Sequence, residues 1–522
     1  LELCPYPGIY VACRLDTMTN PQRPYIGIAL SVVLVKATVF ALAGSRYGFL
    51  SDELYFLDAA ARPAWGYVDL PPLFPWLLAR LPGDSLLALR GAAALIGTLV
   101  VLIGVDLCRI LGGRPLAAAT TAIVLLFAPG FLSVQSIMTM NVLDQLWWFC
   151  AFWLTARYLQ TRRPVLMLGL GLVLGLGVLT KWSLLVLCLA LPVAWLAWDR
   201  TVFRSGSTWL AAALSAAIVM PHVAWQVSND WPLVQFITAY NATTPNALVL
   251  QYPALGMVLT MNPAYALFWV PGAVYLLVCS DRVLRVLGTA AWLCLVGFLA
   301  ASVKFYFAVP VFGLFAIGGA LYWQEALWAR RRASGALALV IAGSGILAVP
   351  GAAPVLPEPQ LHQVTSFLRD SEQAYPGTEP ADLERYFPHF AEMHGWPELV
   401  RLTTTTWQSL APEERRGAVL MASHYGQAGA LNQLADAGAL PEAHGRHVNY
   451  HLWAKDLSIE HGLFVGFGAE ELLPLFAHVE ERGRLQCDHC MARERNLRLH
   501  FVSGPRVSSA EIREQLKRYA FF

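Results

Sequence analysis

The chain has 522 residues, of which 57% are hydrophobic and only 14% are charged, and its mean hydropathy is +0.50. Soluble domains carry about 25% charged residues, so this composition excludes a disordered chain, a collagen-like chain and an ordinary cytosolic enzyme. The net charge of +2 gives no electrostatic basis for nucleic-acid binding. The composition predicts a polytopic membrane protein.

The distribution of charge predicts three parts. Residues 1–24 lack the basic segment and apolar run of a signal peptide, and we expect a disordered leader or a start site assigned too early. Residues 25–351 are predominantly apolar and form the predicted transmembrane domain. Residues 352–522 are about twice as rich in charge, hold eleven of the twelve histidines, and have the size of one soluble domain.

Eleven segments are apolar and long enough to be considered membrane spans, since a transmembrane helix needs about 20 mainly apolar residues. They are 25–43, 87–105, 115–132, 141–156, 165–180, 182–198, 207–226, 258–279, 287–303, 305–323 and 335–351. With the N-terminus in the cytoplasm, every inner loop carries arginine, as the positive-inside rule requires. The predicted fold is therefore a mainly α polytopic bundle in the inner (plasma) membrane, followed by an extracytoplasmic α/β domain.

The first outer loop contains the acidic pair Asp52-Glu53, directly after the first predicted span. Carboxylates this close to lipid must face water or a partner, and one carboxylate beside another can have the raised pKa of a general base. The alternative is structural, because Ser51, Asp52 and Glu53 would also favour the start of a helix.

Three further charged residues near the outer face have both a functional and a structural interpretation. Asp144, followed by Trp147 and Trp148, is either a second acid of a site or an interfacial cap. Lys304 and Lys181 are either cations for a lipid phosphate or side chains that extend to the headgroups.

The C-terminal part has one close cysteine pair, Cys487 and Cys490, with His489 between them. On the outer side a disulfide is the favoured interpretation, ahead of free thiols and of a zinc site, for which a second ligand pair is missing from the sequence. Apolar runs predict strands at 417–423 and 497–503, and we expect helices at 427–437 and 470–481.

Several motifs resemble those of the GT-C glycosyltransferases that use polyprenyl-phosphate sugars. The nearest groups are the protein O-mannosyltransferase-like enzymes and the aminoarabinose transferases that modify lipid A. In the membrane part the motifs are Asp52-Glu53-Leu54-Tyr55, Gly66-Tyr67-Val68-Asp69 with Pro71-Pro72, Arg90-Gly91, Asn141 with Asp144, Thr180-Lys181-Trp182, Asn262-Pro263, and Lys304-Phe305-Tyr306 with Pro310. In the tail they are His424-Tyr425-Gly426-Gln427 and Asn449-Tyr450-His451-Leu452-Trp453.

This resemblance implies a role for individual residues. Asp52 would be the general base or would orient the acceptor, assisted by Glu53, with Asp144 as a second acid. Lys304 would hold the donor phosphate together with Lys181. The family often has a basic residue or histidine before the Pro-Pro pair where this chain has Leu70, so Arg80 is expected to substitute. Four residues are expected to line the cavity or the acceptor side: Tyr55, Tyr67, Asp69 and Tyr306.

The resemblance implies transfer of a sugar from a polyprenyl-phosphate donor to a hydroxyl of lipid A, a glycan, a glycolipid or a protein. Such a donor is already activated, so no nucleotide-binding loop is needed, and the chain has no P-loop motif. No cofactor is required, although a divalent cation could assist. The alternative is a transporter or flippase of lipid-linked glycans, which would also carry intramembrane charges.

Overall fold

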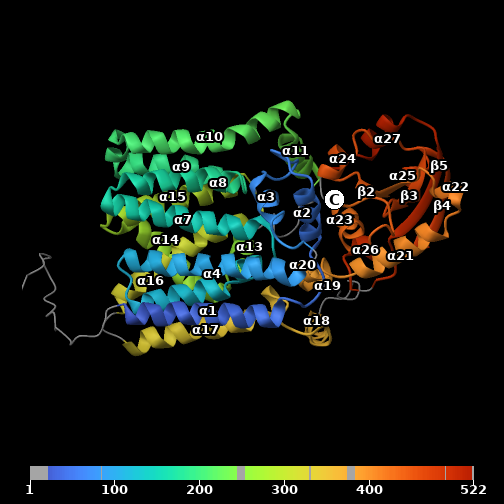
Figure 1. Ribbon diagram of the computed structural model, residues 1–522. Helices are drawn as coiled ribbons and strands as arrows, with labels where there is room; N and C mark the ends of the chain where they lie inside the picture. Colours follow the sequence, from blue (N-terminus) through green and yellow to red (C-terminus); the bar gives the residue numbers. More distant parts are fainter. Residues whose placement is uncertain are drawn as a thin grey trace, which may run out of the picture.

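The computed structural model describes residues 22–83, 85–243, 253–301, 303–327, 331–372, 383–487 and 489–519. Figure 1 shows a long bundle of roughly parallel helices with an α/β domain at one end. The bundle is formed by α1 (Arg23–Ala43), α4 (Leu86–Ile110), α5 (Pro115–Phe127), α7 (Met140–Thr161), α8 (Pro164–Val178), α9 (Ser183–Trp198), α10 (Gly206–Ser228), α14 (Ala266–Val278), α15 (Arg282–Ala300), α16 (Val309–Ala326) and α17 (Arg331–Ala352).

Local sequence explains where several of these helices begin and end. Proline occupies the first helical position of α5 and α8, where its missing N–H costs nothing. Ser85 and Asp281 cap α4 and α15 by accepting hydrogen bonds from backbone N–H groups in the first turn. Arg162 ends α7 in the left-handed conformation, with a φ of 57°.

Among the described residues, six helices are long and apolar enough to cross a membrane, or seven if a pair bent by 63° counts as one span. That pair joins α5 to α6 (Pro129–Leu132) and the 3-10 helix η1 (Val134–Ser136). Shorter apolar helices lie beside them, so the chain is a multi-pass membrane protein. The number of about eleven spans stays a prediction.

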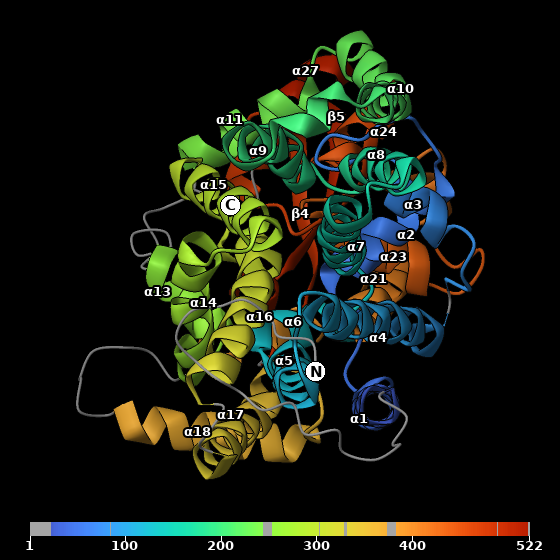
Figure 2. The ribbon, with the colours of Figure 1, turned by 90° about the vertical axis from the view of Figure 1, so that its left-hand side faces the viewer.

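The periphery of the bundle is apolar. In the view along the bundle (Figure 2), α1 and α10 lie on its outside. Leu30 and Leu34 of α1 are 66% and 69% exposed, and Trp209 of α10 is 62% exposed. In water such side chains would be costly, whereas a lipid environment accepts them.

Short helices fill the space between the bundle and the α/β domain (Figure 1). They are α2 (Ser51–Ala61), α3 (Leu73–Leu78), α11 (Pro232–Thr243) and α13 (Pro253–Thr260). The 3-10 helices η3 (Pro263–Tyr265) and η4 (Phe305–Ala308) directly precede α14 and α16. The 3-10 helix η2 (Arg200–Arg204) connects α9 to α10.

The α/β domain contains a five-stranded sheet in the order β2-β1-β3-β5-β4. Its strands are β1 (Val419–Ala422), β2 (Ala443–Gly445), β3 (His461–Val465), β4 (Phe476–Arg484) and β5 (Arg498–Pro505). β1 runs parallel to β2 and β3, whereas β5 is antiparallel to β3 and β4. Neighbouring residues of β1 face opposite sides, so Leu420 joins one apolar core and Val419 joins another.

The helices of this part are α18 (Glu358–Glu372), α19 (Leu383–Tyr386), α20 (Pro388–Ala391), α21 (Trp396–Ser409), α22 (Pro412–Arg415), α23 (Tyr425–Leu434), α24 (Asn449–Trp453), α25 (Ala469–Leu472), α26 (Ala492–Arg495) and α27 (Ser509–Leu516). The helix predicted at 470–481 is wrong. Helix α25 ends before Pro474, and the following residues pair with β5 as β4. Pairing with a neighbouring strand decided this segment, which the local sequence pattern did not show.

Candidate active site

The acidic pair at the start of α2 separates into two environments. Glu53 is buried and accepts hydrogen bonds from the backbone N–H groups of Leu50 and Met138, each at 2.9 Å. The Arg90 guanidinium lies 3.8 Å from Glu53 Oε2, the oxygen that also accepts from Leu50. Glu53 therefore caps α2 and joins it to the segment before α7, which is a structural role beside Asp52.

Asp52 faces the α/β domain. Its Oδ1 accepts a 2.8 Å hydrogen bond from the hydroxyl of Tyr425, at the start of α23. Burial raises the pKa of Asp52, and the Tyr425 hydrogen bond and Lys304 act in the opposite direction. A carboxylate with a raised pKa that keeps one oxygen free of Tyr425 has the properties of a general base.

Two more acids of this region hold the α/β domain against the bundle. Asp58 accepts hydrogen bonds from Tyr450 at 2.5 Å and Asn432 at 2.7 Å. Asp69 accepts one from Tyr55 at 2.5 Å, and Asn449 contacts both residues of that pair. The two tail motifs, which begin at His424 and Asn449, therefore pack against α2 and the loop that follows it.

The second acid, Asp144, lies at the start of α7 beside Lys181. The Ser183 hydroxyl donates to Asp144 Oδ1 at 2.6 Å, and Lys181 Nζ is 3.8 Å from Oδ2. Lys181 also donates to Asn141 at 2.7 Å and lies 3.7 Å from the centre of the Phe307 ring. Asp144 and Lys181 therefore form one buried pair.

Lys304 lies between this pair and Asp52. Its ammonium is 5.5 Å from the centre of the Tyr240 ring, and it interacts electrostatically with Asp52 and Lys181. Tyr306 interacts with Lys304, Asp52 and Asp144. The structure thus brings together an acid held by the α/β domain, two lysines and a second acid.

Two predicted site residues lie elsewhere. Arg80 is exposed after the end of α3, and in the described ranges its side chain makes no hydrogen bond or ion pair with the other candidate residues. The Tyr67 hydroxyl lies 3.0 Å from the carbonyl oxygens of Ala59 and Arg62, which anchors the loop after α2. Both residues follow Asp52 closely in the sequence, yet this proximity does not bring either side chain to the site.

Residues that the sequence did not identify come from the α/β domain. Glu392 accepts a 2.9 Å hydrogen bond from Ser51, the residue before Asp52. Arg493 of α26 lies 3.4 Å from Glu392. Tyr425 belongs to the tail motif that begins at His424, to which the sequence analysis assigns no role. Its hydroxyl group is the signal that could have identified it as a partner of Asp52.

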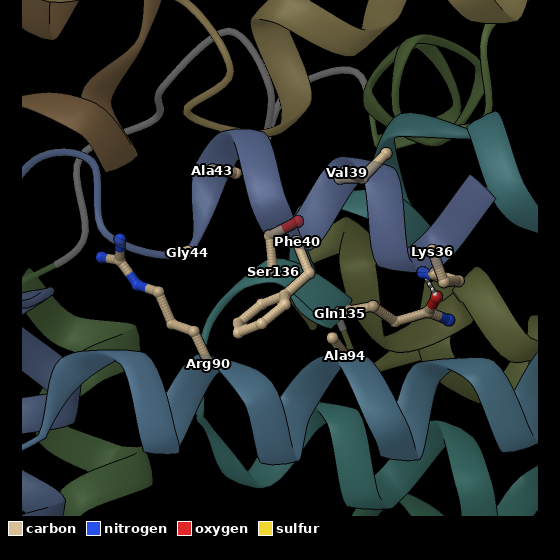
Figure 3. A pocket seen from close by; sticks show the side chains of 9 residues that line it. All are labelled: Lys36, Val39, Phe40, Ala43, Gly44, Arg90, Ala94, Gln135 and Ser136. Atoms are coloured by element: carbon tan, nitrogen blue, oxygen red, sulfur yellow. Dashed lines mark hydrogen bonds between the residues drawn. The ribbon is translucent and has the colours of Figure 1, made fainter. Parts of the chain in front are cut away.

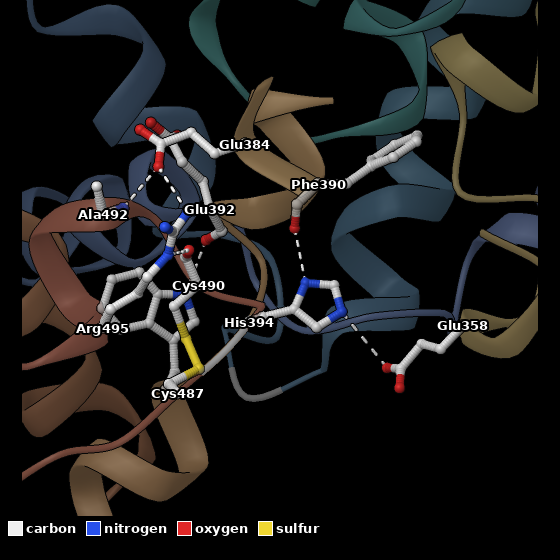
Figure 4. The surroundings of a disulfide bond; sticks show 10 residues. Glu358, Glu384, Phe390, Glu392, His394, Cys487, Cys490, Ala492 and Arg495 are labelled. Carbon is white, nitrogen blue, oxygen red and sulfur yellow. Dashed lines mark hydrogen bonds and ion pairs between the residues drawn. A yellow bond between two sulfur atoms is a disulfide. The ribbon is translucent and has the colours of Figure 1, made fainter. Parts of the chain in front are cut away.

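The segment that carries Arg493 is closed by a disulfide between Cys487 and Cys490 (Figure 4). Gly395, with a φ of +88°, packs against this bond, and a Cβ there would lie 2.2 Å from Cys490 Sγ. Glycine is therefore required at this turn. In the described parts of the chain, no group of three or more His, Cys, Asp or Glu side chains could hold a metal ion.

A separate small pocket lies between α1, α4 and η1 (Figure 3). Lys36 donates a hydrogen bond to Gln135 there, and Gln135 donates to Gln145 at 2.8 Å. Arg90 turns away from Lys36 and donates to the carbonyl oxygens of Arg46 and Gly48. The two hydrogen bonds of Arg90 fix the segment between α1 and α2.

Comparison with known proteins agrees with this architecture. Residues 69–225 match the family model described as dolichyl-phosphate-mannose-protein mannosyltransferase. The apo crystal structure of ArnT from Cupriavidus metallidurans is similar to 94% of this chain and 99% of its own, with 15% identity and a TM-score of 0.56. The structure of ArnT from the same organism bound to undecaprenyl phosphate is similar to 91% of this chain and 98% of its own, with 16% identity and a TM-score of 0.55.

No protein of curated function matches the chain in sequence. At these identities the structural similarity establishes the fold. The chain has the fold of ArnT, and the resemblance to GT-C glycosyltransferases that the motifs predict is confirmed at the level of the fold.

Proposed function

We propose that the protein is an integral-membrane glycosyltransferase that moves a sugar from a polyprenyl-phosphate donor to a hydroxyl group of an envelope acceptor. In the proposed topology the N-terminus is cytoplasmic and the α/β domain and site are on the outer face. The observation that carries the proposal is the position of Asp52, which Tyr425 orients at 2.8 Å and which interacts with Lys304.

The proposed reaction is a single displacement. The acceptor oxygen attacks the anomeric carbon of the donor sugar, and its proton passes to the Asp52 carboxylate. The bond between the anomeric carbon and the phosphate oxygen breaks, and its electron pair leaves with the polyprenyl phosphate. One displacement inverts the anomeric configuration.

The lysines supply the charge that the leaving group requires. A phosphate gains negative charge as its bond to the sugar breaks, and a buried cation stabilises it at that moment. Lys304 is assigned to this phosphate, and Lys181 supports it from the Asp144 pair. The bound undecaprenyl phosphate of the similar ArnT structure supports a lipid-linked phosphate as the donor class. A divalent cation on the phosphate stays a prediction that EDTA treatment tests.

The first experiment compares wild type with Asp52→Asn in membranes that contain a radiolabelled polyprenyl-phosphate sugar. We expect transfer to fall at least about 100-fold, the usual contribution of a general base, while binding of undecaprenyl phosphate is kept. Lys304→Gln should instead weaken that binding. Asp230→Asn is the matched control, because Asp230 is exposed after α10 in the left-handed conformation that asparagine tolerates.

Two results would contradict the proposal. One is equal transfer by wild type and Asp52→Asn. The other is movement of labelled lipid between leaflets, without any transfer, in wild type and variant alike, which would identify a flippase.

A further inference from the structure

A second polar group from the α/β domain lies next to Asp52, and the proposed reaction does not use it. Arg493 Nη2 is 3.4 Å from Glu392 Oε1, and Glu392 Oε2 accepts a hydrogen bond from Ser51. Arg493 also interacts electrostatically with Tyr425, the residue that orients Asp52. These contacts form a continuous polar path from α26 to the start of α2.

His424 adds a hydrogen-bond donor to this group. Its Nδ1 accepts a hydrogen bond from the N–H of Gly426 at 3.1 Å, so its Nε2 carries the hydrogen. The side chain is 7% exposed, and among the described residues nothing accepts a hydrogen bond from Nε2. His424 packs on Tyr425 at 4.2 Å and interacts electrostatically with Arg493. A buried donor of this kind normally has a partner.

The charges here disfavour an anion. The Arg493 guanidinium already contacts two carboxyl groups, Glu392 at 3.4 Å and Glu494 at 3.2 Å. Arg446, which also interacts with His424, forms an ion pair with Glu471. Lys304 is assigned to the donor phosphate, so its charge is already balanced when the acceptor binds. A phosphate acceptor would have to separate Arg493 from these carboxyl groups, whereas an uncharged acceptor would not.

We propose that Glu392, Arg493 and His424 form the acceptor subsite, and that it takes an uncharged carbohydrate. This inference rests on the proposed function, and it specifies the chemical class of the acceptor in that reaction. Each sugar hydroxyl both donates and accepts a hydrogen bond, so adjacent hydroxyls match a carboxylate next to N–H donors. A serine or threonine of a protein offers one hydroxyl and would leave part of this group without a partner.

The chain supplies a matched control on the other side of the same segment. Arg495 and Glu384 form an ion pair at 3.3 Å, with side-chain exposures of 24% and 30%. The corresponding values for Arg493 and Glu392 are 27% and 24%. Figure 4 shows Glu384 with Arg495, and Glu392 nearby. The two pairs therefore differ mainly in their position relative to Ser51 and Asp52.

The experiment measures sugar transfer and undecaprenyl phosphate binding for Glu392→Gln, Arg493→Lys and Arg493→Gln. We expect transfer to fall at least tenfold in each, with binding within twofold of wild type. Glu384→Gln and Arg495→Gln should keep both within twofold. Thermal unfolding identifies any variant that fails to fold. If Arg493→Gln does not fold, Arg493→Lys still tests the proposal, because it keeps the positive charge.

The wild-type product identifies the acceptor class. We expect the label in a glycosidic bond to an uncharged sugar, stable to mild acid and to protease. A bond cleaved by mild acid, as in a glycosyl phosphate, or label released as glycopeptide, would overturn the inference, as would equal losses in the control pair. If wild type transfers no sugar and binds no undecaprenyl phosphate, the proposed function itself fails.

Discussion

The Tyr425 hydroxyl donates a 2.8 Å hydrogen bond to Asp52, although 373 positions separate the two residues in the sequence. Asp52 lies in the first turn of α2, the helix that follows α1, and Tyr425 lies in the α/β domain. The candidate general base is therefore oriented by a domain that lies outside the helix bundle. A change that separates the α/β domain from the bundle should therefore also abolish sugar transfer.

Replacing Tyr425 by phenylalanine tests this relationship through pH. The hydrogen bond stabilises the charged form of Asp52, so its loss should raise the pKa of Asp52 further. The base must be ionised to act, and the acid limb of the kcat/KM profile should therefore move to higher pH. Tyr450→Phe removes a comparable bond to Asp58 and should leave that limb in place. An unchanged limb in both variants would refute the role of Tyr425.

Gly429→Ala tests the close packing of α23 on α2. A Cβ at Gly429 would lie 2.9 Å from the Leu54 carbonyl carbon, so the two helices must move apart. Overpacking of this kind costs about 1–3 kcal/mol. We expect a lower unfolding temperature in detergent and a parallel loss of transfer. Gly206→Ala is the control, since nothing lies within 4 Å of its Cβ position. Full activity and an unchanged unfolding temperature in Gly429→Ala would show that transfer does not require this close packing of α23 on α2.

The disulfide should stabilise the segment that carries Arg493. Cys487 and Cys490 are separated by three positions, and closing so short a loop contributes about 2 kcal/mol in the chain-entropy model. Replacing both by serine should lower the unfolding temperature and reduce transfer. Reductant should produce the same change in wild type and none in the double variant. A reductant effect that persists in the variant would assign the change to another site.

Glu494 should make stability depend on pH. Burial raises its pKa from 4.5 to about 7, so folding favours the protonated carboxyl group. Its contribution to stability is complete below pH 4.5 and is lost as pH rises through about 7. Glu494→Gln should lose stability less steeply than wild type over this window in thermal unfolding. Glu414→Gln, at a half-buried ion pair with Arg482, serves as control. Identical pH curves for wild type and Glu494→Gln would contradict the assignment.

The sequence by itself determined the class of this protein. Apolar runs with arginine in alternate loops predict a membrane bundle, because hydrocarbon accepts only apolar helical segments of that length. The Asp52-Glu53 and Lys304 motifs predicted the GT-C fold, which the similarity to ArnT confirms. The strand at 417–423 was also predictable, since a short continuous apolar run fits a buried strand.

Tertiary structure decided which neighbours in the sequence share a function. Asp52 and Glu53 are adjacent, yet the rotation of about 100° per residue along α2 sends one to Tyr425 and the other to the backbone of Leu50 and Met138. The contribution of Arg493 and Glu392 could not be read from the chain, because it depends on how the α/β domain docks. Such contacts form between distant segments, and no local periodicity or spacing encodes them.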